Sequence, residues 1–205
     1  GQERACQHYE RLLEIEPGRS DASEFLIAHY TQKGLYDQVA GLLEDRLAAV
    51  SRLEASGDGV SNPNRVQSLC LRIAELRAEQ LGDPCGAIEA LETAYSNAGP
   101  VGAATEPLAE LYQQTHRQRE LIELCERAAT ACSSAEERAR WLLRLAACLQ
   151  QEGDDAGAAA AYREVLDERP YAVVRPDGTK VQTTPDGTRL EVRPDGSRKQ
   201  EMPDG

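Results

Sequence analysis

The 205-residue sequence predicts a mostly α-helical protein, an antiparallel helical-hairpin solenoid followed by a small antiparallel β-meander. Three observations predict this fold. Hydrophobic residues make up 40% of the chain but aromatic residues only 4%, so alanine and leucine supply most of the apolar surface, which suits closely packed helices. A helical pattern recurs with a basic interval of 34 residues up to position 170, and a Pro-Asp-Gly triplet recurs every 9 residues after it.

The helical pattern is a small or apolar residue followed four and seven positions later by apolar or aromatic residues. These offsets place three side chains on one helix face. The first copy runs from Ala5 to Pro17 and the last from Ala158 to Pro170, and in both a proline ends the helix. Weaker copies begin at 39, 87 and 121, so the leading positions are 5, 39, 87, 121 and 158, separated by 34, 48, 34 and 37 residues.

A first helix precedes each later copy of the pattern, and a tight turn is expected five positions before the leading residue. These turn positions hold Gly34, Gly82, His116 and Gly153. The period and these positions resemble the tetratricopeptide repeat (TPR). The resemblance implies a TPR-like α-solenoid over residues 1–170, with a half-repeat at 1–17 and hairpins at about 20–53, 65–97, 102–132 and 135–169. Since the array starts in mid-unit, we expect the parent protein or another subunit to complete the stack.

The longest interval contains about 14 extra residues, which fall around 48–64. We expect the second helix of that hairpin to continue through Leu53, and the segment after it to be a loop. A long loop is sometimes functional, but an insertion without a function is the simpler explanation of this one.

The tail, residues 171–205, contains four turn triplets: Pro176, Asp177 and Gly178; Pro185, Asp186 and Gly187; Pro194, Asp195 and Gly196; Pro203, Asp204 and Gly205. Proline presets φ at the first corner of a turn and glycine accepts a positive φ, so a type I turn with a glycine bulge is expected at each triplet. The residues between triplets alternate as strands do, with Val181 and Thr183 on one face and Leu190 and Val192 on one face. We expect a β-meander with at best one thin apolar side and open edges.

These triplets, followed by Thr179, Thr188 and Ser197, resemble the G-box repeats of the T-complex protein 10 C-terminal family, which occurs in centriole-assembly and ciliary proteins. The resemblance implies a solvent-exposed antiparallel sheet that recruits partners and stacks end to end. A calcium-binding nonapeptide β-helix shares the period of nine, but the Gly-Gly-x-Gly-x-Asp pattern that it needs is absent.

The formal net charge is −12, and the tail contributes 6 basic and 6 acidic residues, so the excess of acid lies in residues 1–170. An acidic body repels phosphate backbones, and we expect no nucleic-acid partner. No apolar run approaches about 18 residues, so we expect no membrane partner. The alternative explanation of the acidic excess is that it keeps the protein soluble and has no bearing on its partners.

Catalytic and metal-binding patterns are missing. The six cysteines form no CxxC pair; five fall in predicted helices as small apolar residues, and Cys85 falls in a predicted turn. His8, His29 and His116 have no ligand or triad partner at a suitable spacing. We expect no catalytic residue, cofactor or metal, and no enzymatic activity.

If the TPR register holds, the first helices line a concave groove. The candidate groove residues are Glu24, Thr31, Arg72, Glu79, Glu106, Glu110, Gln113 and Gln150. Some TPR proteins clamp a terminal carboxylate with lysine and asparagine. This groove holds acids, glutamines and one arginine, so a basic or neutral segment suits it better. A solvated helix face is the alternative interpretation.

These features favour a non-enzymatic protein–protein interaction and assembly scaffold, with the groove and the strand edges as contact surfaces, in a cytoskeletal, ciliary or centriolar assembly. One alternative is a self-assembling filament subunit, and this alternative includes an extracellular filament. The other alternative is a bacterial TPR adaptor. A cytoplasmic or cytoskeletal location is favoured, and an extracellular filament stays open.

Overall fold

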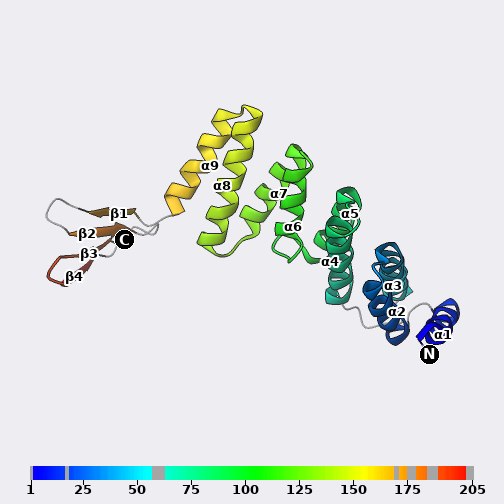
Figure 1. The fold of residues 1–205 in the computed structure, drawn as a ribbon. Coiled ribbons are helices and arrows are strands. Elements are labelled where there is room, and N and C mark those ends of the chain that lie inside the picture. Colours follow the sequence, from blue (N-terminus) through cyan, green and yellow to red (C-terminus); the bar gives the residue numbers. More distant parts are fainter. Residues whose placement is uncertain are drawn as a thin grey trace. The chain divides into compact units, whose positions relative to one another are not determined.

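The computed structural model describes residues 2–16, 19–56, 63–168, 171–174, 179–183 and 189–201. This part of the chain forms nine helices and then four strands (Figure 1). The helices are α1 (Gln2–Ile15), α2 (Ser20–Gln32), α3 (Tyr36–Ser56), α4 (Pro63–Glu79), α5 (Pro84–Ala98), α6 (Thr105–Gln114), α7 (Gln118–Ala131), α8 (Ala135–Glu152) and α9 (Asp155–Glu168). The strands are β1 (Tyr171–Val174), β2 (Lys180–Thr183), β3 (Arg189–Val192) and β4 (Arg198–Glu201). The predicted fold class is confirmed.

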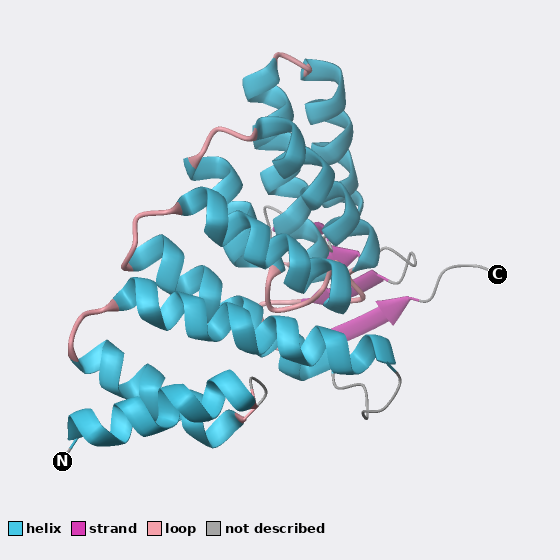
Figure 2. Ribbon diagram, turned by 90° about the vertical axis from the view of Figure 1, so that its right-hand side faces the viewer, coloured by secondary structure: helices cyan, strands magenta, loops and turns pink. Residues whose placement is uncertain are grey.

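The chain divides into two compact units, residues 1–116 and 117–205. In the first unit α2 pairs with α3 and α4 with α5, while α1 packs on α2 and α6 on α5 (Figure 2). In the second unit α8 pairs with α9, α7 packs on α8, and the four strands form one sheet. A separate domain boundary between residues 170 and 171 stays a prediction.

The buried side chains follow the repeat register. In the second helices, the leading residues Val39, Ala87, Leu121 and Ala158 are all buried. In the first helices, the residues thirteen positions earlier are also all buried, namely Leu26, Ala74, Leu108 and Leu145. Small alanines at these contacts let neighbouring helices approach closely, so these contacts need few aromatic residues.

All four predicted turn positions have left-handed backbone conformations. Their φ angles are +70° at Gly34, +62° at Gly82, +57° at His116 and +83° at Gly153. At two of these turns the next amide donates to a carbonyl five residues back, from Leu35 to Tyr30 (3.0 Å) and from Asp154 to Leu149 (2.9 Å). This pattern satisfies carbonyls at the end of the first helix and reverses the chain.

Two of the turns share a helix-starting motif that follows the glycine. Asp83 accepts a hydrogen bond from the amide of Gly86 (3.0 Å) at the start of α5. Asp154 accepts one from the amide of Gly157 (2.9 Å) at the start of α9. An aspartate cap of this kind satisfies an amide that has no partner within the helix. The sequence Gly-Asp-x-x-Gly therefore ends one helix and begins the next.

The sheet has the strand order β1-β2-β3-β4, with every neighbouring pair antiparallel. Val181 lies opposite Glu191, and Leu190 lies opposite Gln182. Odd-numbered residues pair with odd-numbered ones and even-numbered with even-numbered, so each face of the sheet carries residues of one kind. Equivalent positions of two repeats are nine residues apart and therefore lie on opposite faces. Val181 and Leu190 therefore lie on opposite faces. The expectation of a single apolar side was wrong, because an odd period distributes the apolar residues over both sides.

The turn between β3 and β4 has the predicted chemistry. Gly196 has φ +84°, and its amide donates to the carbonyl of Arg193 (3.0 Å). The backbone amide of Arg193 donates in turn to the carbonyl of Ser197 (3.0 Å), which places the glycine in a bulge. The other predicted turn triplets lie outside the described residues: Pro176, Asp177 and Gly178; Pro185, Asp186 and Gly187; Pro203, Asp204 and Gly205.

The cysteines are all free thiols, and Cys85 alone of the six is exposed. Cys85 lies in the first turn of α5, not in a turn before it, because Pro84 already occupies the first helical position. Burial raises the pKa of the Cys70 and Cys148 thiols, which suits their packing role. None of the described helices is long and apolar enough to span a membrane.

Candidate functional site

A cavity of the first unit lies between α4, α5 and α6 and has a volume of about 510 Å³. We call it the α4–α6 cavity. Its lining residues come from α4 (Leu71, Ala74, Glu75, Ala78 and Glu79), from α5 (Leu91) and from α6 (Pro107, Glu110, Leu111 and Gln114). Leucine, alanine and proline side chains form the apolar part of this lining.

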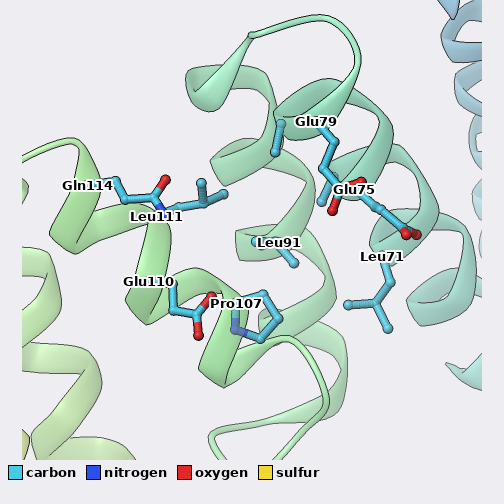
Figure 3. A pocket seen from close by; sticks show the side chains of 10 residues that line it. Leu71, Glu75, Glu79, Leu91, Pro107, Glu110, Leu111 and Gln114 are labelled. Carbon is cyan, nitrogen blue, oxygen red and sulfur yellow. The ribbon is translucent and has the colours of Figure 1, made fainter.

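Figure 3 shows how the polar groups surround this apolar part. Glu75 and Glu79 extend from α4, while Glu110 and Gln114 extend from α6, and Leu91 lies between the two helices. The three glutamates are exposed. Among the described residues, none of these three carboxylates has a hydrogen-bond or ion-pair partner. The cavity therefore combines an apolar lining with a negatively charged rim.

A second cavity, of about 270 Å³, lies on the other side of α4, and we call it the α2–α4 cavity. Its lining comes from α2 (Ile27 and Thr31), from α3 (Tyr36, Val39 and Leu43), and from α4 and the residue after it (Arg72, Glu75, Leu76, Glu79 and Gln80). Glu75 and Glu79 thus line both cavities. They are four residues apart, so they form a short ridge along one face of α4.

The arginine in the α2–α4 cavity already has an anionic partner. Arg72 donates to Oε1 of Glu24 at 3.1 Å, and Arg46 of α3 donates to the same oxygen. Burial alone would raise the pKa of Glu24, but hydrogen bonds from the two arginines outweigh it and hold this pKa below its ordinary value. Glu24 therefore joins α2 to α3 and α4, and neutralises Arg72.

Other polar contacts fix the helices around the two cavities. Arg77 of α4 pairs with Glu44 of α3 and with Asp83 before α5 (3.0 Å). The Tyr112 hydroxyl on α6 donates to Glu92 of α5 (2.8 Å). These contacts lie beside the cavities and hold α3, α4, α5 and α6 in place, so both cavities are features of the folded unit.

The tyrosine and glutamate at the α1–α2 contact form a further polar link. The Tyr30 hydroxyl donates to Glu10 of α1. Burial and this carboxylate raise the pKa of Tyr30 to about 12, so the hydroxyl keeps its proton at neutral pH. The pair joins α1 to the first complete hairpin.

The structure brings four of the candidate groove residues to the cavities. Thr31, Arg72 and Glu79 line the α2–α4 cavity, and Glu79 and Glu110 line the α4–α6 cavity. Glu24 lies next to them through its pair with Arg72. Glu106 and Gln113 are exposed on α6 but line neither cavity, and Gln150 is exposed on α8 in the second unit. The use of these residues in binding stays a prediction.

Sequence reasoning missed Glu75 and the apolar lining. Leu71, Glu75, Ala78 and Glu79 follow spacings of four, three and one along α4, which place them on one helix face. That spacing was a usable signal in the sequence. The contributions of Leu91 and Leu111 depend on how three helices pack, and no single-helix pattern contains that information.

The second unit has a cavity of its own, of about 590 Å³, lined from α7, α8 and α9 by Glu126, Ala129, Thr130, Arg138, Leu142, Leu145 and Glu164. Here an arginine balances part of the acidic charge. Within the described ranges, no three His, Cys, Asp or Glu side chains gather in a geometry that could hold a metal ion.

No family model matches the sequence, and no curated protein matches it. Several solved structures are similar in fold. A crystal structure of MamA aligns over 79% of this chain and 85% of its own, with 14% identity and a TM-score of 0.49. YrrB, described as a TPR protein with an unusual peptide-binding site, aligns over 80% of this chain and 76% of its own, with 16% identity and a TM-score of 0.48. A putative kinesin light chain from Podosopora anserina with nearly identical TPR-like repeats aligns over 80% and 85%, with 20% identity and a TM-score of 0.49.

Proposed function

We propose that the chain is a non-enzymatic protein-interaction and assembly module that binds a segment of a partner protein between its first helices. The observation that carries this proposal is the α4–α6 cavity, which has an apolar lining and carboxylates at its rim. Its volume of about 510 Å³ lies within the range of ligand-binding pockets, roughly 300–1,000 Å³.

The physical driving force is burial of the apolar lining. Leu71 and Pro107 keep accessible surface in the unbound protein. An apolar side chain of a partner that enters the cavity removes this surface from water, and polar rim groups then fix its orientation. A short peptide segment fits this arrangement better than a large flat partner, because the lining is concave and comes from three helices.

Selection from a random peptide library displayed on phage tests the proposal. We expect the full chain to enrich peptides, and we expect Ala78→Phe, which fills the cavity from α4, to abolish their binding in fluorescence anisotropy. Ala160→Phe places the same substitution on an exposed position of α9 and is the matched control. Failure to enrich any peptide, or equal binding by both variants, would overturn the proposal.

A second contact surface follows from the strand order, because β1 and β4 are the edges of the sheet. All four side chains of β4 are exposed and polar: Arg198, Lys199, Gln200 and Glu201. Charged residues on an edge strand disfavour unguided pairing, so β1 is the better pairing edge. Pairing of β1 with β1 of a second copy is symmetric and stops at a dimer, whereas a filament requires β4 to pair as well.

Size-exclusion chromatography with light scattering over a concentration series separates these assemblies. A mass that saturates at a dimer favours β1-to-β1 pairing, and a mass that grows with concentration favours the filament. A monomer at every concentration would contradict self-assembly through the sheet.

The cellular setting is proposed from the G-box resemblance of the tail alone. It favours a cytoskeletal, ciliary or centriolar assembly, with an extracellular filament or a bacterial adaptor as alternatives. Deletion of 171–205 distinguishes them: an adaptor keeps both its peptide binding and its cellular localisation, whereas a scaffold recruited through its β-repeats loses its localisation.

A further inference from the structure

The α4 ridge separates two apolar cavities and is itself acidic. Glu75 and Glu79 line the α4–α6 cavity on one side and the α2–α4 cavity on the other. A ligand that fills both cavities therefore has to cross these two carboxylates. Covering them with an apolar segment would remove two charges from water without a compensating partner, which is strongly unfavourable.

The net charge around the ridge is negative. Of the described residues that line the two cavities, Arg72 is the basic one, and its guanidinium is held by Glu24 at 3.1 Å. Glu110 adds a third carboxylate on the side of α6. The complementary group on a ligand is therefore a cation, placed between two apolar side chains.

We propose that the occupant is an extended peptide segment of a partner protein, with one apolar side chain in each cavity and a lysine or arginine between them over Glu75 and Glu79. This inference rests on the proposed function and specifies the class of segment that is bound. The α4–α6 cavity, of about 510 Å³, takes the larger apolar side chain, and the α2–α4 cavity, of about 270 Å³, takes the smaller.

The spacing of the two anchors follows from the width of one helix. The cavities flank α4, so the anchors lie about 10 Å apart. An extended chain advances about 3.3 Å per residue. The two apolar residues are therefore about three positions apart, with the cation at one of the two positions between them.

The probe is a fluorescein-labelled peptide, Gly-Leu-Ser-Lys-Leu-Gly, together with two longer versions that separate the leucines by four and five positions. The uncharged partner of each peptide has glutamine in place of lysine. Binding to the full chain is measured by fluorescence anisotropy at low and high ionic strength. We expect the lysine peptides to bind about tenfold more tightly than the glutamine peptides, and to lose this advantage at high salt.

The decisive comparison is a double-mutant cycle. The double variant Glu75→Gln with Glu79→Gln should weaken the lysine peptide about tenfold and leave the glutamine peptide nearly unchanged. The variant Glu89→Gln with Glu120→Gln alters the net charge equally at exposed positions away from both cavities and should bind as the wild type does. Circular dichroism of each variant reports whether the helices are retained.

The outcomes separate this inference from the proposed function. If neither lysine-to-glutamine nor glutamate-to-glutamine changes binding, yet Ala78→Phe abolishes it, the cation requirement is wrong and the peptide site stands. The same holds if phage selection yields peptides without basic residues. If no peptide binds and selection enriches none, both proposals fail.

Discussion

Gly86 leaves the space that the guanidinium group of Arg77 occupies. A Cβ atom built on Gly86 would lie 1.8 Å from Nη1 of Arg77 and 2.3 Å from Oδ2 of Asp83. Arg77 pairs with Asp83 and with Glu44 of α3. The absence of a side chain at position 86 thus permits an ion-paired junction between α3, α4 and the start of α5, beside the α2–α4 cavity.

Gly86→Ala should therefore destabilise the first unit, although alanine is the better helix former. We expect a loss of about 1 kcal/mol in the free energy of unfolding, because the displaced arginine no longer forms its two ion pairs. These pairs are partly exposed, so the loss stays small. Gly157→Ala is the matched control, because a Cβ there meets Asp154 and Leu149 but no arginine. Urea unfolding of both variants measures the difference. Equal losses, or a difference that survives in an Arg77→Met background, would contradict this role.

Two substitutions at the left-handed turns should change the free energy of unfolding in opposite directions. His116 is the one non-glycine residue with positive φ among the described residues. Because a side chain in this conformation costs about 1 kcal/mol, His116→Gly should raise the free energy of unfolding by a little less than that, and Gly153→Ala should lower it by about 1 kcal/mol. Chemical denaturation measures both. A His116→Gly variant less stable than the wild type would show that the histidine side chain makes a stabilising contact.

The lowered pKa of Glu24 predicts a pH-dependent contribution to stability. In the folded chain burial alone would raise this pKa, but Arg46 and Arg72 keep it below its ordinary value, so the carboxylate stabilises the fold at neutral pH. This contribution is lost as the pH falls through the folded pKa. Glu24→Gln should cost less than about 1 kcal/mol at pH 7, since the side chain is half exposed, and still less at pH 3. Thermal unfolding at the two pH values is the measurement, and a cost independent of pH would be the contrary result.

The turn at Gly196 predicts the effect of a substitution in the tail. Valine at positive φ is strongly disfavoured, so Gly196→Val should disorder the pairing of β3 with β4 while the helical circular dichroism is retained. Backbone amide shifts of residues 189–201 in NMR spectra report the pairing. A parallel loss of helical signal would mean that the sheet supports the helices, against the predicted division at residue 170.

Local backbone chemistry explains how much of the fold could be predicted. The turns at Gly82 and Gly153 follow from residues within one turn of the helix end, and the repeat spacing already located them. The faces of the sheet required one further step, because the period of nine is odd and moves Leu190 to the face opposite Val181. The odd period can be read from the sequence alone.

The candidate site was predicted less completely, for a geometric reason. Glu79 and Glu110 were found because they lie on first helices. Glu75 was not among the candidates, although it also lies on a first helix, four positions before Glu79. Leu91 lies on a second helix and reaches the cavity only through the packing of α5 between α4 and α6, which depends on contacts distant in sequence.

The most direct test of the central claim is to locate a bound peptide by NMR of the full chain with labelled leucine methyl groups. On addition of Gly-Leu-Ser-Lys-Leu-Gly, or of a peptide selected on phage, we predict shifts at Leu71, Leu91 and Leu111, which line the α4–α6 cavity. Leu142 and Leu145 line the cavity of the second unit and should not shift. Saturable shifts at Leu142 and Leu145 without shifts around α4 would contradict the account.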